Sequence, residues 1–294
     1  MRDAAIVRVY VLASAAVLLY GLTPFWTKVA IGAADGITVG SLRAFVALVP
    51  ALAIIAIWRL PLPRHGNAFW LVLISGGGGL AGFPVLFSWG VQHTSARHAA
   101  AGTASAAVVA GILMALIDRR WPSPAWWSGI VIGFAGALVL IWETVGFAVE
   151  GVTLAGDLLV FAGMATGVVG YIAGARLTVV YGTVATSMWS VVVAAIMLVP
   201  VMVWYSDTSV LFEITVPQWG AICSLAWGNT IAAYLLWNRA LADGGIARIG
   251  ALQLFQPALG IAAAVAFLDE PLTWPLAIAT IIVLCGVVLV QRSR

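Results

Sequence analysis

The chain has 294 residues, of which 63% are hydrophobic and only 9% are charged. A soluble domain of this length needs far more polar surface, so the composition indicates a protein that lies in a lipid bilayer. The formal net charge of +3 gives no reason to expect a nucleic-acid partner. Two cysteines, both within apolar stretches, are too few for a disulfide framework or a metal site.

Ten apolar stretches are long enough to cross a membrane as helices of about 20 residues. In chain order we predict them at 7–31, 37–58, 68–91, 94–117, 125–142, 153–175, 183–205, 217–240, 245–268 and 273–291. The first stretch is too long for a secretory signal peptide, and the connections are too short to hold a soluble domain. The sequence therefore predicts an all-α polytopic membrane protein.

The second half of the sequence repeats features of the first. An Ala-Arg pair precedes an aspartate by the same 21 residues in both halves, at Arg97 and Asp118 and again at Arg248 and Asp269. A division near residue 150 leaves five predicted helices on each side, and an odd number inverts the second set in the membrane. We therefore predict two inverted five-helix repeats, residues 1–150 and 151–294, with a substrate held between them.

Arginine and lysine are distributed unevenly along this topology. With the N-terminus in the cytoplasm, the external side receives three of the fourteen cations, Lys28, Arg43 and Arg97. The cytoplasmic ends and loops receive the other eleven, Arg2, Arg8, Arg59, Arg64, Arg119, Arg120, Arg176, Arg239, Arg248, Arg292 and Arg294. This excess predicts a cell inner membrane protein with both termini in the cytoplasm.

Helix one carries Tyr20, Thr23 and Thr27 on one face, and Pro24 interrupts its backbone ladder. A proline frees a carbonyl group at membrane depth, so this face is a candidate substrate contact. Lys28 and Arg43 lie near the ends of helices one and two and need a partner or a path to water. Two interpretations stay open for both: contact with a substrate carboxylate, or hydrogen bonds to carbonyl groups of neighbouring helices.

Helix three contains four consecutive glycines, Gly76, Gly77, Gly78 and Gly79, followed by Phe83, a candidate substrate contact. Glycine weakens a helix by about 1 kcal/mol per residue relative to alanine. The run is either a hinge for the rocking of the halves, which we favour, or a surface for close helix packing. In helix four, His98 is either a substrate contact and proton carrier or a packed hydrogen-bonding group.

In helix eight, Trp227, Thr230, Tyr234 and Asn238 follow helical spacing and are predicted to share one face. Such an aromatic and polar face is a suitable cavity wall for a small zwitterion or an aromatic metabolite. Helix nine adds two amides and a second proline break. These are Gln253, Gln256 and Pro257. We predict the amides as substrate contacts or interhelical hydrogen bonds, and Pro24 and Pro257 as hinge points.

The residues that carry a resemblance to a known family are distributed over both halves. They are Leu19-Tyr20-Gly21, Lys28, Arg43, Thr94-Ser95-Ala96, Asp118-Arg119-Arg120, Gly129, Gly136, Gly156-Asp157-Leu158, Tyr234-Leu235-Leu236-Trp237, Ala240-Leu241, Gln256-Pro257, Asp269-Glu270-Pro271-Leu272 and Gly286. In this order the chain resembles the EamA-type ten-helix proteins of the drug/metabolite transporter superfamily, and is similar to their aromatic amino-acid exporters. The resemblance implies transport by alternating access and a cavity lined by helix eight. One departure is near Ala106, where the counterpart of Pro257 is missing and the helix break is expected to be lost.

These patterns predict a secondary transporter that exports amino acids, aromatic ones among them, or related small metabolites. Nucleotide sugars or other anionic metabolites are the alternative within the same fold. An intramembrane enzyme is disfavoured because no nucleophile motif, metal motif or paired aspartates occur in the sequence. No phosphate-binding loop is present either, so transport is passive or ion-coupled. We expect no cofactor and a monomeric transport unit.

Overall fold

A computed structural model of the chain describes residues 2–64, 66–118, 123–146, 151–206, 208–244, 252–253 and 255–292. Every regular element within these ranges is a helix, and none of the described residues forms a strand. Part of the sequence-based prediction falls on residues outside these ranges: Arg119, Arg120, Arg248, Arg294 and the side chain of Asn238.

The described helices before residue 150 cover the first five predicted segments. They are α1 (Arg2–Gly21), α2 (Thr23–Ala30), α3 (Gly36–Trp58), α4 (Asn67–Ile74), η1 (Ser75–Gly82), α5 (Phe83–Gln92), α6 (Ala96–Gly102), α7 (Ser105–Asp118) and α8 (Pro124–Gly146). Two of the predicted segments are divided: α1 and α2 meet at Leu22, and α6 and α7 meet at Thr103. The segment α4–η1–α5 is continuous, but η1 has the wider turns of a π-helix.

The helices after residue 150 begin with one long element, α9 (Leu154–Trp204). Its 51 residues would extend about 77 Å at the α-helical rise, more than twice the hydrocarbon core of a bilayer. Gly182, with φ +76°, lies in the left-handed region that favours glycine and divides it into two arms. The remaining elements are η2 (Thr208–Phe212), α10 (Val216–Cys223), η3 (Ser224–Ala233), α11 (Tyr234–Gly244), α13 (Phe255–Leu268) and α14 (Trp274–Arg292).

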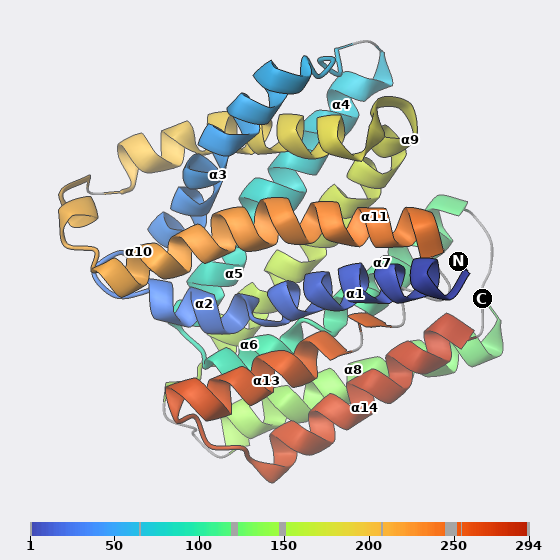
Figure 1. Cartoon of the computed structure of the whole chain (residues 1–294). Coiled ribbons are helices and arrows are strands. Elements are labelled where there is room, and N and C mark those ends of the chain that lie inside the picture. The colour runs from blue at the N-terminus through green and yellow to red at the C-terminus, as the bar shows by residue number, and fades with distance from the viewer. Residues whose placement is uncertain are drawn as a thin grey trace.

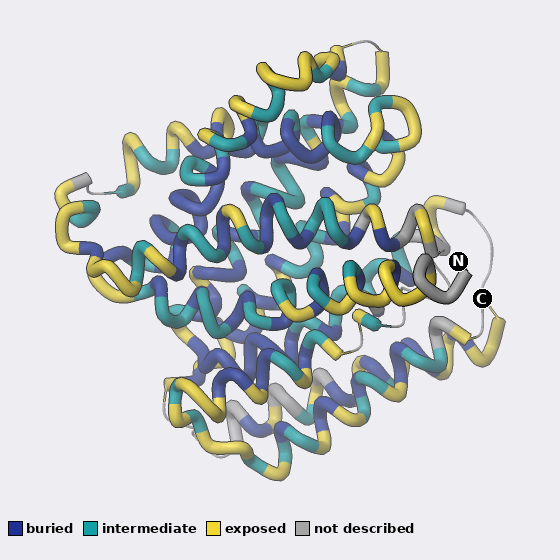
Figure 2. The backbone as a smooth tube through the Cα atoms, in the orientation of Figure 1, coloured by how far each residue is buried: buried dark blue, intermediate teal, exposed yellow. Residues whose placement is uncertain are grey.

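Among the described residues, four segments are long and apolar enough to cross a membrane: Ile6–Ala30, Gly36–Trp58, Asn67–Gln92 and Leu154–Trp204. Figure 2 shows that many residues on the outside of the bundle are exposed. Many of these exposed residues have large apolar side chains, among them Trp204. A water-facing surface seldom carries so many of them. In lipid, the exposure of large apolar side chains carries no free-energy penalty.

Most of the principal helix contacts join an element before residue 150 to one after it, and the packing of α3 on α5 is the main exception. Helix α1 packs on α11, η1 and α5 pack on α9, α6 packs on α13, and α8 packs on α14 (Figure 1). The α8–α14 pair, the predicted helices five and ten, has a glycine contact at its centre, where a Cβ on Gly286 would lie 2.5 Å from the nitrogen of Gly133. Small residues of this kind let two backbones approach closely in lipid.

The helix break predicted to be lost near Ala106 is present, so that prediction is wrong. Between α6 and α7, the amides of Ala104 and Ala106 bond to carbonyls only three residues back. The hydroxyl of Thr103 also donates to the carbonyl of Ala100 at 2.6 Å. This side chain competes for the backbone, as threonine does in helices, and interrupts the helix without a proline.

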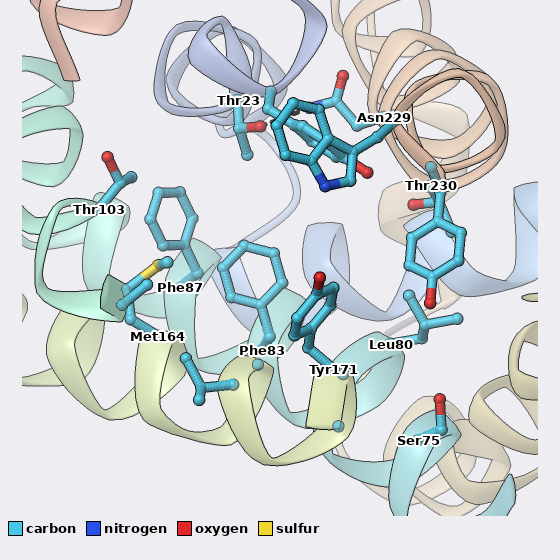
Figure 3. A pocket seen from close by; sticks show the side chains of 18 of the residues that line it. Thr23, Ser75, Leu80, Phe83, Phe87, Thr103, Met164, Tyr171, Asn229 and Thr230 are labelled. Carbon is cyan, nitrogen blue, oxygen red and sulfur yellow. Dashed lines mark hydrogen bonds between the residues drawn. The ribbon is translucent and has the colours of Figure 1, made fainter. Parts of the chain in front are cut away.

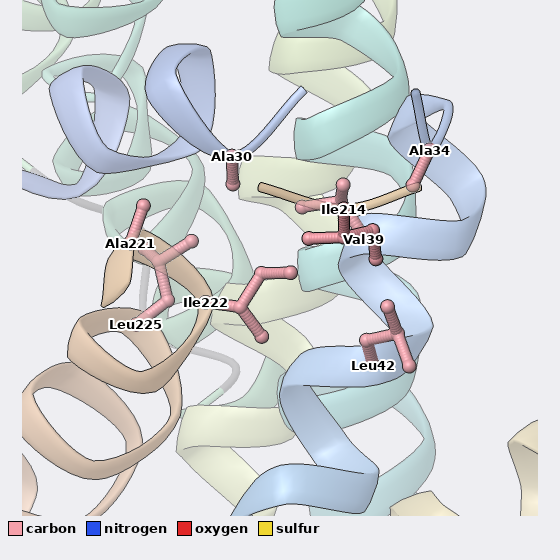
Figure 4. Packing of buried hydrophobic residues seen from close by; sticks show 8 residues of the cluster. All are labelled: Ala30, Ala34, Val39, Leu42, Ile214, Ala221, Ile222 and Leu225. Carbon is pink, nitrogen blue, oxygen red and sulfur yellow. The ribbon is translucent and has the colours of Figure 1, made fainter. Parts of the chain in front are cut away.

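The first helix begins and the last helix ends at the same end of the bundle, here called the proximal end (Figure 1). The opposite, distal end includes the end of α2, the α5–α6 turn, the start of α9 and the α13–α14 turn. Part of it is closed by an apolar cluster that joins α2, α3 and α10 (Figure 4). Its buried members are Ala30, Ala34, Val39, Leu42, Ile214, Ala221, Ile222 and Leu225.

Candidate functional site

A cavity of about 290 Å³ lies between elements from both sides of residue 150 (Figure 3). Its aromatic lining consists of Tyr20, Phe83, Phe87, Tyr171, Tyr234 and Trp237. Its polar lining consists of Thr23, Ser75, Thr103, Ser187, Ser190, Asn229, Thr230, Gln253 and Gln256. Aromatic walls with a few convergent polar groups are typical of small-molecule sites.

Arg43, on α3, is the single charged side chain among the described residues that line the cavity. It is 6% exposed, its Nε donates to Thr230 Oγ1 at 2.8 Å, and its guanidinium carbon lies 5.6 Å from the centre of the Phe83 ring. Within the described part of the chain no carboxylate forms an ion pair with it. A buried cation of this kind lacks the anion that normally compensates it, and a bound anion would supply that charge.

The polar groups near Arg43 are held by hydrogen bonds of their own. Asn229 Nδ2 donates to Thr23 Oγ1, which joins η3 to α2, and Ser190 Oγ donates to Ser75 Oγ at 3.0 Å. Figure 3 shows Thr23 and Asn229 beside each other, with Phe83 and Tyr171 projecting from the other wall. Asn229 Oδ1 is buried and accepts no hydrogen bond from the described residues. The cavity wall thus offers one cationic group, Arg43, held in place by Thr230.

Most of the sequence-predicted substrate contacts come together at this cavity. They are Tyr20, Thr23, Arg43, Phe83, Thr230, Tyr234, Gln253 and Gln256, with Gly79 of the glycine run. The sequence analysis missed Asn229, Tyr171 and Phe87. Asn229 had a usable signal, since an amide within an apolar span is costly without a partner. Tyr171 and Phe87 had none, because they lie in uniformly apolar segments.

Trp227 is not part of the cavity, contrary to the predicted face of helix eight. Its side chain is 51% exposed and its indole Nε1 donates to the carbonyl of Val46 at 3.0 Å. The prediction assumed α-helical spacing, but η3 is a π-helix. Its wider turn changes the angle between Trp227 and Thr230, so the two side chains point to different sides.

Three other predicted residues near the distal end of helix one lie outside the cavity lining. Lys28 Nζ donates to the carbonyls of Val91 and Thr94, at 3.2 and 2.8 Å. Of the two interpretations for this lysine, the structure therefore supports carbonyl capping of a neighbouring helix. Thr27 is buried away from the lining, and Pro24 lies in the first turn of α2.

Two further predicted site residues, Pro257 and His98, also lie outside the cavity lining. Pro257 is buried in the first turn of α13 and does not line the cavity. His98 is 1% exposed and also lies outside the lining. Its ring instead lies between the carboxylates of Asp157 and Glu143 near the distal end.

The glycine run lies in η1 against both arms of α9. A Cβ on Gly76 would lie 2.7 Å from the carbonyl oxygen of Ser190, and one on Gly78 would lie 2.9 Å from that of Thr166. These contacts support the packing interpretation at Gly76 and Gly78. The hinge stays a prediction, and Gly77 tests it, because there a Cβ would meet only the flexible end of Met197.

We expect the substitution Gly77→Ala to slow transport about threefold while the melting temperature stays the same or rises. Alanine favours the helical backbone by about 0.5–1 kcal/mol relative to glycine. This preference would oppose the bending of a hinge but would not disturb a packed helix. The measurement is initial transport rate and thermal melting of the same preparation. An unchanged rate would assign the run to packing alone.

A second pair of variants tests which side of η3 faces the substrate. We expect Thr230→Val to raise the KM of a transported solute about tenfold, because it removes the hydroxyl that positions Arg43. Trp227→Ala, three residues away, should change KM less than about twofold because its side chain points outward. Equal losses in the two variants would contradict this geometry.

Comparison with known proteins places the chain in a family. The model of the EamA-like transporter family matches residues 7–142 and again residues 154–292. The chain is 27% identical over 269 residues to the uncharacterized transporter YdeK of Bacillus subtilis (strain 168), covering 90% of this chain and 91% of that protein. It is also 27% identical over 174 residues to the uncharacterized transporter YyaM of the same organism, covering 59% of this chain and 55% of that one.

Among solved structures, a crystal structure of a protein matches with a TM-score of 0.66 at 19% identity, over 96% of this chain and 95% of that one, which shows a common fold. The two matches to the family model together span nearly the whole sequence. The chain is an integral membrane transporter that belongs to the EamA-like transporter family of the drug/metabolite transporter superfamily.

Proposed function

We propose that this protein is a secondary transporter of amino acids or closely related small carboxylates, moved by alternating access. The observation that carries the proposal is Arg43, a buried cation without an ionic partner among the described residues at an otherwise neutral cavity wall. The planar guanidinium matches a carboxylate with two parallel hydrogen bonds. Nε is already used by Thr230, so the two terminal nitrogens are the donors for a substrate.

The rest of the cavity suits the other groups of an amino acid. The amide oxygens of Gln253 and Gln256, which line the cavity, can accept from the α-ammonium group. The aromatic rings of Phe83, Phe87 and Tyr171 provide an apolar wall for the side chain. Aromatic amino acids gain most from such a wall, because ring pairs contribute about 0.5–1.5 kcal/mol beyond the burial of area.

Nucleotide sugars fit this cavity less well. Their two phosphates need several cationic donors, and the described lining contains only Arg43. The volume of about 290 Å³ lies at the lower limit of the roughly 300–1,000 Å³ usual for small-molecule sites. Both points favour a compact solute with one negative charge.

The proposal includes a topology of ten spans in two inverted repeats, residues 1–150 and 151–294. The two family-model matches on either side of residue 150 support it. So do the π-helical segments η1 and η3, which occupy the middle of the third and the eighth spans. The distribution of arginine and lysine supports an inner-membrane protein with cytoplasmic termini. We propose further that the protein exports its solute and works as a monomer.

The test is uptake and exchange in proteoliposomes that contain the purified protein, with a panel of radiolabelled amino acids, other small carboxylates and a nucleotide sugar. We expect at least one amino acid to move and to be inhibited by unlabelled analogues that keep the carboxylate. Amides of the same amino acids should not compete. Movement of the nucleotide sugar alone would overturn the proposed substrate class while leaving the fold intact.

A further inference from the structure

A cluster of buried ionisable side chains lies near the distal end, apart from the cavity lining. His98 on α6, Glu143 on α8 and Asp157 on α9 are 1%, 1% and 2% exposed. Arg97, beside His98, is 2% exposed. Ionisable groups are rarely buried together within a membrane protein unless they form a structural network or take part in transport.

The contacts of the imidazole ring of His98 indicate where the cluster needs a proton. Nδ1 of His98 forms a hydrogen bond of 3.3 Å with Asp157 Oδ2, whereas Nε2 faces Glu143 Oε2 at 3.6 Å, and neither of these last two atoms has a hydrogen-bond partner among the described residues. A neutral imidazole has one N–H donor and one acceptor, and an ionised carboxylate only accepts. One of the two contacts therefore sets two acceptors against each other unless the ring or a carboxyl group holds an additional proton.

Both acids are fixed in place by second hydrogen bonds. Thr94 Oγ1 donates to Asp157 Oδ1 at 2.6 Å, and Thr273 Oγ1 donates to Glu143 Oε1. Each carboxylate thus keeps its other oxygen toward His98. This geometry brings together four separate segments of the chain, at residues 94–98, 143, 157 and 273.

The neighbouring charges complete the electrostatic surroundings of the ring. Nε and Nη1 of Arg97 are buried and find no partner among the described residues. Glu270 accepts from the backbone N–H groups of Ala96 and Arg97 at 2.9 Å each, and Lys28 from α2 is bonded to carbonyls nearby. The parts of α5, α13 and α14 that pack on α6 bring no charged side chain, since Arg292 lies at the far end of α14.

The cluster also joins the two sides of the molecule. His98 and Glu143 lie before residue 150, whereas their partners Asp157 and Thr273 lie after it. At the helical rise, His98 is about 7.5 Å along the axis of α6 from Thr103, which lines the cavity. Separation of the distal ends of the halves would have to break these contacts.

We infer that His98, Asp157 and Glu143 form a proton-binding site that controls opening of the distal end, an inference that rests on the proposed alternating-access transport. With the proton bound, His98 and Arg97 together balance the charges of Asp157 and Glu143. Loss of the proton leaves a buried negative charge without compensation, which is costly. The bound proton therefore stabilises the closed distal end, and its release favours opening to water.

The direct test is NMR of the protein in nanodiscs with isotope-labelled histidine rings, which needs no transported solute. The chain has three histidines, and His98→Asn identifies the signal of His98. We expect the His98 signal to report a protonated ring at pH 7 in the wild type. Glu143→Gln should lower the titration midpoint of His98 by at least about one pH unit, which is a tenfold loss of proton affinity. The reason is that the glutamine amide can donate a hydrogen bond to the unprotonated nitrogen of a neutral imidazole, whereas a carboxylate cannot.

Two controls keep this test decisive. Glu213→Gln makes the same chemical change at an exposed glutamate and should leave the His98 signal unchanged. Asp157→Asn provides a second route should Glu143→Gln fail to yield folded protein, as judged by its melting curve. A neutral His98 ring at pH 7 in the wild type, or the same midpoint in every variant, would overturn the inference.

A transport experiment tests the coupling separately. In proteoliposomes, a pH gradient should stimulate transport by the wild type at least about fivefold, whereas Glu143→Gln should transport at a rate independent of the gradient. Wild-type transport that ignores the gradient would overturn the coupling while the proposed function stands. If no solute of the panel moves through the wild type, the proposed function fails, and the NMR result still decides whether His98 binds the proton.

Discussion

Replacement of Arg43 by glutamine is expected to raise the KM for a transported amino acid about 10- to 100-fold. The expected size follows from the roughly 1.5–3 kcal/mol that a hydrogen bond to a charged group contributes. Because Arg43 is buried without an ionic partner among the described residues, its neutral replacement should leave the melting temperature unchanged or raise it. Loss of transport with full stability is therefore the result that identifies a substrate contact.

Two further variants define what Arg43 contributes. Arg43→Lys keeps the charge but loses the planar pair of donors, so its KM should lie between those of the wild type and Arg43→Gln. Arg8→Gln removes an exposed arginine of α1 outside the cavity and serves as the matched control. A normal KM for Arg43→Gln, measured over the amino-acid panel, would transfer carboxylate recognition to another part of the cavity.

The positions of most helices could be predicted from hydropathy, because a bilayer forces the backbone into helices of a limited length. The second and third predicted segments, 37–58 and 68–91, differ by one residue at most at either end from α3 and the α4–η1–α5 segment. Interruptions within helices were less predictable. Pro24 marks the break at Leu22. Thr103, in contrast, interrupts helix four through a hydrogen bond of its own side chain, and no proline near it indicates the break in the sequence.

The candidate site was predictable where a polar residue interrupts an apolar span, as Arg43 and Thr230 do. It was not predictable where the helix departs from regular geometry, since the π-helix η3 turns Trp227 outward. The partners of His98 could not be predicted from the sequence either. Glu143 and Asp157 belong to other helices, and no local pattern relates them to His98.

The second large effect is expected from Gly170→Ala, at the contact between α9 and η1. A Cβ at this position would lie 2.1 Å from the nitrogen and 2.4 Å from the Cα of Gly79. Both are backbone atoms, so the helices themselves must move apart. Overpacking of this kind costs about 1–3 kcal/mol, and we expect the melting temperature in detergent or nanodiscs to fall by about 2–10 °C.

Gly220→Ala is the matched control, because a Cβ there meets nothing within 4 Å. Its only expected effect is a gain of up to about 1 kcal/mol in helix propensity. The contrast matters because helices in lipid are not driven together by the hydrophobic effect, so close backbone contact is a main source of their association. If Gly170→Ala melts like the wild type, η1 yields easily at Gly79, and the glycine run then has the compliance that a hinge requires.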